Sequence, residues 1–140
     1  DAIILSKAGI DSLKINHKIT EEFTTEDIIP CAGQGIIAIQ CRSSDPELKD
    51  LLEKINDLQS RICANTEREV LKILEGDCDT AIGIFSKINE DNISLAAELF
   101  SVDGKKRYFI KQKKEIKFAK ELGIEVGKTL KIQSKGSYKR

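Results

Sequence analysis

The second half of the chain changes from a helical hydrophobic period to a strand-like one and back again. Over residues 58–75 the apolar residues recur at three- and four-residue spacing, and the same pattern returns over residues 115–132. Three shorter apolar segments, separated by turn residues, are typical of strands. They span residues 81–89, 93–102 and 105–113. This order predicts an α+β fold, in which a three-stranded antiparallel sheet carries helices on one face.

Individual residues refine these elements. Asp57 is suited to cap the helix that follows it, and Asp103-Gly104 predicts a two-residue hairpin turn. Gly123 weakens the last helix, because glycine costs about 1 kcal/mol relative to alanine in a helix interior. The polar and basic residues 133–140 are expected to fray, as chain ends commonly do.

The first half of the chain is less regular. Residues 2–14 predict an amphipathic helix, and residues 15–27 are polar and turn-like. Residues 36–41 form a nearly continuous apolar run, which predicts a buried strand. A short helix is expected over residues 46–56, because proline suits the first helical position.

Composition narrows the class of protein. The 140 residues include 23 Lys and Arg and 23 Asp and Glu, so net charge favours neither nucleic acid nor an anionic membrane as a partner. No apolar run approaches the roughly 20 residues of a membrane helix, and the first residues do not resemble a signal peptide. We therefore expect a cytoplasmic protein. Methionine is absent, which indicates an excerpt from a longer chain or a mature chain whose initiator was removed.

The four cysteines fit no zinc or redox motif, because the gaps between them are irregular. They favour reduced thiols and no metal site, although their even number leaves disulfides open. Cys78 stands out, since it follows a predicted helix end at Gly76, where a left-handed residue is needed. A thiol at a helix-to-strand corner is well placed to hold a covalently attached group. The alternative is a small buried side chain that fills the corner.

A glycine-rich stretch precedes the apolar run of the first half. Gly33 and Gly35 permit positive φ or a close backbone approach, so the stretch is a plain turn, a hinge, or a backbone segment that touches a ligand. Arg42 ends the apolar run. It can bind a carboxylate through two hydrogen bonds or form a surface ion pair.

Four stretches of the chain, taken in order, resemble the motifs of one enzyme family. Residues 30–35 read Pro-Cys-Ala-Gly-Gln-Gly, and an apolar run with Cys41-Arg42 follows them. The other stretches are Asp-Ala-Ile-Ile-Leu at 1–5 with Ala-Gly-Ile at 8–10, Thr-Glu-Arg at 66–68, and Leu-Glu-Gly-Asp-Cys at 74–78. Together they resemble porphobilinogen deaminase, also called hydroxymethylbilane synthase, over nearly the whole chain.

The resemblance implies a domain division and a reaction. Residues 1–35 would end the family's second domain, of α/β type, residues 36–57 would return to its first domain, and residues 58–140 would form its C-terminal cofactor-carrying α+β domain. The family's enzyme is a transferase of haem and porphyrin biosynthesis. It joins four porphobilinogen units, with loss of ammonia, into the linear tetrapyrrole hydroxymethylbilane. The implied partners are porphobilinogen, the growing pyrrole chain and the missing N-terminal part of the same enzyme, in a monomer.

The resemblance also implies a cofactor site. Cys78 matches the cysteine that carries a dipyrromethane cofactor through a thioether. Arg42 is the matching candidate for a contact with a pyrrole carboxylate. Gln34 in the glycine-rich stretch is a further candidate, and the resemblance places Leu5 and Ser6 near the cofactor.

Two observations set this chain apart from the family pattern. Asp77 replaces a glycine of the family, and with Asp79 it places negative charge beside Cys78, which disfavours a thiolate. The family's catalytic aspartate and most of its substrate-binding arginines lie in the N-terminal half, so we expect this chain alone to be inactive. This chain has five arginines, which are Arg42, Arg61, Arg68, Arg107 and Arg140.

An alternative is a non-catalytic α+β binding or interaction module.

Overall fold

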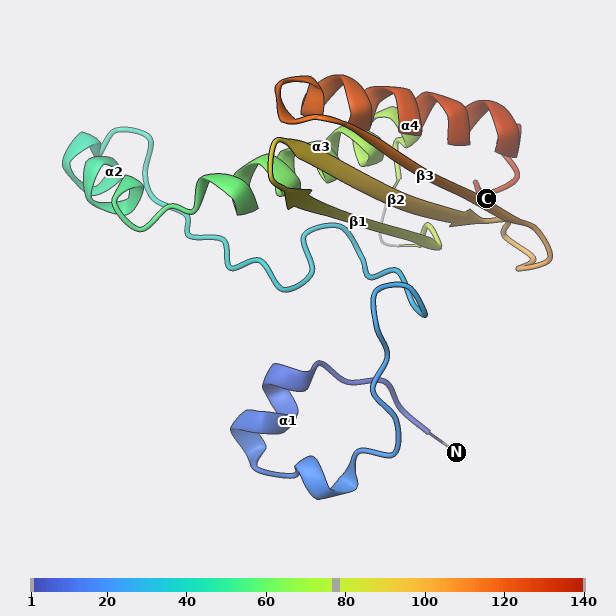
Figure 1. Cartoon of the computed structure of the whole chain (residues 1–140), viewed down its shortest axis with the longest axis horizontal. Coiled ribbons are helices and arrows are strands. Elements are labelled where there is room, and N and C mark those ends of the chain that lie inside the picture. The colour runs from blue at the N-terminus through green and yellow to red at the C-terminus, as the bar shows by residue number, and fades with distance from the viewer. Residues whose placement is uncertain (1, 77–78, 140) are drawn as a thin grey trace.

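The computed structural model describes residues 2–76 and 79–139, and Figure 1 shows its layers. A three-stranded antiparallel sheet has the order β1-β2-β3, and two long helices cover one of its faces. The α+β class predicted from the hydrophobic pattern is therefore confirmed. The elements of this unit are α3 (Leu58–Leu74), β1 (Ile82–Asn89), β2 (Asn92–Phe100), β3 (Arg107–Glu115) and α4 (Ala119–Ser134), the last preceded by the 3-10 turn η2 (Ile116–Phe118).

The core lies between the sheet and its helices. Alternate residues of the central strand β2 point into it, and Leu95 and Leu99 are fully buried there. Val70 and Leu74 of α3 and Leu122 of α4 meet them from the helix side, also without exposed surface. Burial of side chains of this size contributes about 1.5–3 kcal/mol each, so this contact layer holds the unit together.

The second hairpin differs from the predicted two-residue turn. Phe100 pairs with Arg107, so a six-residue loop separates β2 from β3. The Asp103 carboxylate explains the longer loop, because it accepts hydrogen bonds from the Ser101 hydroxyl at 2.6 Å and from the Lys105 amide at 3.1 Å. These side-chain bonds add to the backbone bonds within the loop, from the Ser101 amide to the Lys106 carbonyl at 3.0 Å and from the Gly104 amide to the Ser101 carbonyl at 2.8 Å.

Glycines let the two helices approach each other closely. A Cβ added at Gly123 would lie 2.4 Å from the carbonyl oxygen of Thr66, and one at Gly127 would lie 2.8 Å from Cβ of Ile73. Gly123 was expected to weaken α4. In the structure Gly123 lies at the contact between α4 and α3. The closer packing of the two helices offsets the low helix propensity of glycine.

The C-terminal residues are packed rather than frayed. Tyr138 has 4% of its surface exposed, and its hydroxyl donates a hydrogen bond to the carbonyl oxygen of Leu74 at 2.9 Å. Lys135 and Gly136 adopt positive φ and turn the chain back after α4. The expectation of a frayed tail was wrong, because Tyr138 packs in the core and bonds to Leu74, which is 64 residues earlier in the sequence.

The N-terminal half lies beside this unit and contains short helices (Figure 1). They are α1 (Lys7–Leu13), the 3-10 turn η1 (Asn16–Lys18) and α2 (Pro46–Glu53). The helix predicted over residues 2–14 begins only at Lys7, where the Ser6 hydroxyl caps it by accepting from the Gly9 amide. The Asp45 carboxylate caps α2 in the same way.

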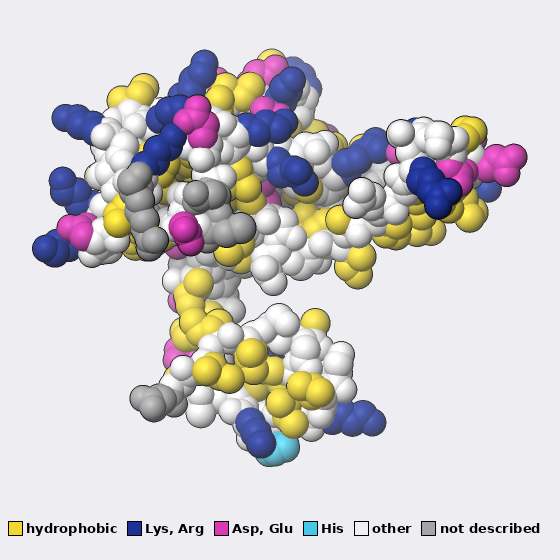
Figure 2. Space-filling model, turned by 180° about the vertical axis from the view of Figure 1, so that it is seen from behind, with side chains coloured by type: hydrophobic (Ala, Val, Ile, Leu, Met, Phe, Trp, Pro, Cys, Tyr) yellow, Lys and Arg dark blue, Asp and Glu magenta, His cyan; other side chains and the backbone are white. Residues whose placement is uncertain are grey.

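The buried strand predicted at residues 36–41 is not formed. Ile37 is 90% exposed and Ile39 is 59% exposed, and no strand of the described residues pairs with this segment. An apolar run becomes a strand only where a neighbouring strand supplies hydrogen bonds and cover. Exposed hydrophobic side chains also gather on the α1 and α2 segments (Figure 2). They include Ile3, Ile4, Leu5, Leu13, Leu48, Leu51 and Ile55.

Within residues 2–76 and 79–139, none of the helices combines the length and the apolar character that crossing a membrane requires.

Candidate functional site

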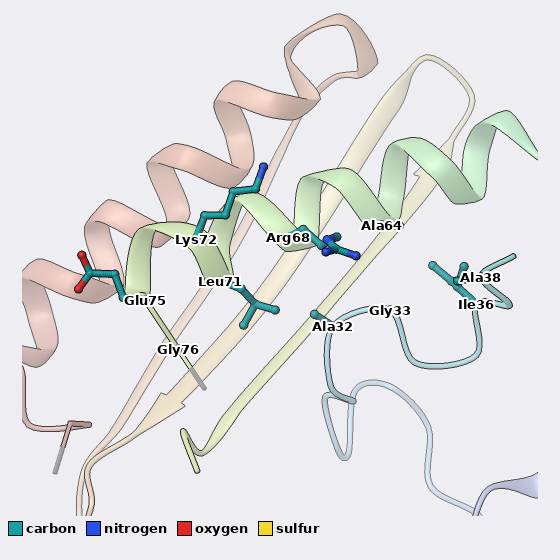
Figure 3. Close-up of a pocket in the computed structure, with 10 residues that line it drawn as sticks. All are labelled: Ala32, Gly33, Ile36, Ala38, Ala64, Arg68, Leu71, Lys72, Glu75 and Gly76. Atoms are coloured by element: carbon teal, nitrogen blue, oxygen red, sulfur yellow. The ribbon is translucent and has the colours of Figure 1, made fainter. Parts of the chain in front are cut away.

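A cleft of about 530 Å³ separates the glycine-rich stretch from the C-terminal half of α3 (Figure 3). Its walls come from two parts of the chain that are far apart in sequence. One wall is formed by Ala32, Gly33, Ile36 and Ala38, and the other by Ala64, Arg68, Leu71, Lys72, Glu75 and Gly76. Gly76 is the last described residue before Asp77 and Cys78, so the cleft lies where the predicted cofactor loop begins.

A buried carboxylate holds the two walls together. Glu67 of α3 is 3% exposed, and its Oε2 accepts a hydrogen bond from the Gly33 amide at 2.7 Å. Its Oε1 accepts from the amide and the hydroxyl of Ser86 in β1, at 2.7 and 2.8 Å. One side chain thus joins the glycine-rich stretch, the helix and the sheet. Charged acceptors form the stronger hydrogen bonds in proteins, so this contact fixes the rim of the cleft.

The helical period explains which residues of α3 face the cleft. Asp57 caps the helix at its start by accepting from the Ser60 amide at 2.7 Å, as expected from the sequence. Residues 64, 68, 71, 72 and 75 then fall on one side, at spacings of three and four. Glu67 belongs to the neighbouring side, which faces the sheet.

The two cationic side chains that line the cleft differ in whether they form an ion pair. Among the described residues, the Arg68 guanidinium has no hydrogen bond or ion pair, and it lies on the cleft side of α3 in Figure 3. The Lys72 ammonium is instead bound to Glu69 at 2.6 Å, and this hydrogen bond holds the pKa of the Glu69 carboxyl below its usual value. Arg68 is therefore the cleft cation that remains available for an anionic ligand.

The glycine-rich stretch adopts a tight double turn. Gly33 and Gly35 have φ of +75° and +82°, a conformation that side-chain-bearing residues rarely adopt. The Gln34 amide donates to the Cys31 carbonyl at 3.0 Å, and the Ile36 amide donates to the Gly33 carbonyl at 3.1 Å. The sequence left open positive φ or a close backbone approach at these glycines, and the structure shows positive φ at both, with the Gly33 backbone at the cleft.

The structure brings only part of the predicted site together. Cys78 lies outside the described residues, so its surroundings are not described, but Gly76 before it lines the cleft. Gln34 is exposed next to Gly33. Arg42, Leu5 and Ser6 are exposed and do not line the cleft. Arg42 borders a second, shallower hollow with Gln40, Cys41, Asp45 and Leu48.

Sequence reasoning assigned no function to the two residues of α3 that define this site. Glu67 and Arg68 entered the sequence analysis only as part of the Thr-Glu-Arg motif and, for Arg68, as one of the five arginines. The signal was present in the Thr66-Glu67-Arg68 motif, but the spacing of the motif does not show that the carboxylate is buried and the cation is not.

The other cysteines have separate environments. Cys31, Cys41 and Cys63 are free thiols, exposed, half-buried and buried respectively. Burial raises the pKa of the Cys63 thiol, and the hydrogen bond with Ser86 opposes that effect. A thiol with a raised pKa is a poor nucleophile at neutral pH, so Cys63 acts as a core side chain.

Two segments of the chain match known protein families. Residues 61–132 match the family described as porphobilinogen deaminase, C-terminal domain. Residues 1–50 match that described as porphobilinogen deaminase, dipyromethane cofactor binding domain. The porphobilinogen deaminase of Desulforamulus reducens is 35% identical over 130 residues, which are 93% of this chain and 42% of that protein.

Two further relatives carry the same name. The porphobilinogen deaminase of Exiguobacterium sibiricum is 42% identical over 106 residues, covering 74% of this chain and 34% of its own length. That of Coxiella burnetii is 34% identical over 140 residues, covering the whole chain and 46% of its own length. The chain thus spans less than half the length of these relatives.

Proposed function

The chain belongs to the porphobilinogen deaminase family, and from this membership we propose that it is the cofactor-carrying part of a transferase that condenses four porphobilinogen units into hydroxymethylbilane. The observation that carries the proposal is the cleft beside Gly76, lined by the Gly33 backbone and by Arg68, whose guanidinium has no partner among residues 2–76 and 79–139. Porphobilinogen carries acetate and propionate groups, so a site for it needs cations and backbone donors.

The described residues suit a dipyrromethane cofactor attached through a thioether to Cys78. Gly76 lines the cleft and is two residues before Cys78 in the sequence, so the proposal assigns the cofactor to the cleft that Arg68 also lines. Cys78 would hold the group as a thioether built from two porphobilinogen units, with each new bond to a methylene carbon replacing a carbon–nitrogen bond and the thiol proton leaving with the first of two ammonia molecules. When bound, the cofactor supplies the primer pyrrole for chain growth.

The roles of the chain's own residues follow from the geometry. Arg68 binds a carboxylate of a pyrrole in the cleft, because a guanidinium presents two parallel donors to a carboxylate. Glu67 keeps the Gly33 turn in place on the opposite wall. Arg42, Gln34, Leu5 and Ser6 remain predicted contacts, which the complete enzyme would bring nearer through other parts of its structure.

The domain division remains part of the proposal. In it, residues 1–35 and 36–57 belong to the family's second and first domains, and residues 58–140 form the third. The exposure of Ile37 and Ile39 supports it, because an apolar segment of this kind needs a sheet to join. We propose that the rest of the enzyme supplies that sheet, the general acid for deamination and the remaining arginines.

The assay that tests this function follows porphobilinogen consumption and ammonia release by the full-length protein, with the 140-residue chain as the comparison. The full-length protein should consume porphobilinogen, and the 140-residue chain should not. No consumption by a folded full-length protein would favour the non-catalytic module instead. Turnover by the 140-residue chain would overturn the proposed division of the site between two parts.

A further inference from the structure

The C-terminal end of α3 is capped by residues from the end of the chain. A helix leaves its last four carbonyl groups without partners inside the helix. Here the amides of Glu75 and Gly76 turn back to the carbonyls of Lys72 and Leu71, each at 3.3 Å. This pattern satisfies two of the four groups, and the carbonyls of Ile73 and Leu74 remain.

Those two carbonyls are bound by side chains that lie far away in the sequence. The Lys131 ammonium donates to the Ile73 carbonyl at 3.1 Å, and the Tyr138 hydroxyl donates to the Leu74 carbonyl at 2.9 Å. Glu75, at φ +54°, is an unfavourable residue for this left-handed position. Its carboxylate holds Lys139 at 2.6 Å and Lys131 at 3.6 Å.

The C-terminal segment is itself anchored. The Ser137 carbonyl accepts from the Val102 amide at 2.9 Å, and the Ser137 hydroxyl shares a hydrogen bond with the Tyr108 hydroxyl at 3.0 Å. Tyr138 belongs to the hydrophobic core. The segment is therefore a fixed part of the fold, able to hold the helix end against the sheet.

We propose that Tyr138, supported by Lys131 and Lys139, positions the last turn of α3 and thereby the start of the loop that carries Cys78. The proposal rests on the proposed function, in which Cys78 bears the cofactor. The same turn supplies Leu71, Lys72 and Glu75 to the cleft wall. Loosening it therefore moves the attachment point and one wall of the cleft together, which slows cofactor attachment without removing any residue that contacts the cofactor.

The test compares Tyr138→Phe with Thr129→Val in the full-length protein. Each substitution removes one hydroxyl that donates to a backbone carbonyl, but only the Tyr138 hydroxyl reaches α3, whereas that of Thr129 bonds within α4. Amide hydrogen exchange is followed in peptides covering residues 71–76. Adduct formation on Cys78 is followed by mass, after porphobilinogen is added to cofactor-free protein well below the unfolding midpoint of each variant.

Tyr138→Phe should speed exchange over residues 71–76 by about tenfold, the scale of one lost hydrogen bond, and should slow adduct formation several-fold. Thr129→Val should do neither. Wild-type exchange and attachment in Tyr138→Phe would overturn the proposal, as would equal slowing in both variants, which indicates general loss of stability. If wild-type Cys78 never gains an adduct, the proposed function fails, whereas the exchange result still decides whether Tyr138 holds the helix end.

Discussion

Gly33 donates its amide hydrogen to the carboxylate of Glu67 at 2.7 Å across 34 residues of sequence. The same carboxylate binds Ser86 of β1 through its other oxygen. A buried acidic side chain therefore holds the glycine-rich stretch, together with the backbone hydrogen bond from the Ile84 amide to the Pro30 carbonyl at 2.7 Å. Because the stretch forms one wall of the cleft, Glu67 connects the stability of the fold to the shape of the site.

Replacement of Glu67 by glutamine should destabilise the protein. Glutamine has one acceptor oxygen, so either Gly33 or Ser86 loses its partner, at a cost of about 1–3 kcal/mol for a buried unsatisfied group. Urea unfolding of the 140-residue chain measures this change. Glu53→Gln is the control, because Glu53 forms an exposed pair with Arg61 that is worth about 0–1 kcal/mol. Equal effects in the two variants would refute a special role for Glu67.

Replacement of Arg68 should weaken the interaction with the ligand and leave the stability of the fold nearly unchanged. Arg68→Ala in the full-length enzyme should lower kcat/KM for porphobilinogen by about tenfold to a hundredfold, because a hydrogen bond to a charged group is worth about 1.5–3 kcal/mol. The unfolding midpoint should stay close to that of the wild type. Arg61→Ala, on the same helix but paired with Glu53, should retain activity. An active Arg68→Ala variant would remove Arg68 from the site.

Gly123→Ala distinguishes helix propensity from packing. Alanine is favoured by about 1 kcal/mol in a free helix, but its Cβ would lie 2.4 Å from the Thr66 carbonyl. We expect a net loss of about 1–3 kcal/mol in the free energy of unfolding, as for other overpacked contacts. Lys128→Ala, at an exposed position of α4, should change it little. A stabilised Gly123→Ala chain would show that the helices separate at low cost.

The ion pairs of Glu75 predict a pH dependence. The hydrogen bond with Lys139, together with the charge of Lys131, lowers the pKa of the Glu75 carboxyl from its usual 4.5. A lowered pKa gives stability that is present above the unfolded-state pKa and is lost as pH falls through the folded-state pKa. Glu75→Gln should thus lower the unfolding midpoint at neutral pH, and the difference from wild type should close below pH 4.5.

Salt provides the control for this interpretation. The Glu75 pairs are exposed, so high ionic strength should narrow the difference between wild type and Glu75→Gln at neutral pH. A difference that is independent of both pH and salt would show that the substitution acts through something other than charge.

The fold could be predicted because its signals are local. Asp57 caps α3, and the period of apolar residues changes where the strands begin. Residues 133–140 and 36–41 were predicted wrongly because their states depend on distant partners. Tyr138 packs in the hydrophobic core, where its hydroxyl donates a hydrogen bond to the Leu74 carbonyl. Ile37 is exposed because no described strand pairs with it.

The sequence predicted only part of the site, because the rest depends on contacts between distant residues. The glycines on either side of Gln34 predicted a turn. The hydrogen bond between the Gly33 amide and Glu67 could not be predicted, because it joins residues that are far apart in the sequence. The left-handed residue was expected at Gly76, whereas the structure has it at Glu75, because α3 ends one residue earlier. Lysines from the end of the chain bind the Glu75 carboxylate there, which no local pattern indicates.

The most direct test of the central claim is the intact mass of the full-length protein, produced in a host that supplies porphobilinogen, followed by peptide mapping. The proposal predicts an added mass equal to two linked pyrroles, located on Cys78 and absent from a Cys78→Ser variant. A bare Cys78 in folded wild-type protein, or an adduct on another cysteine, would contradict it.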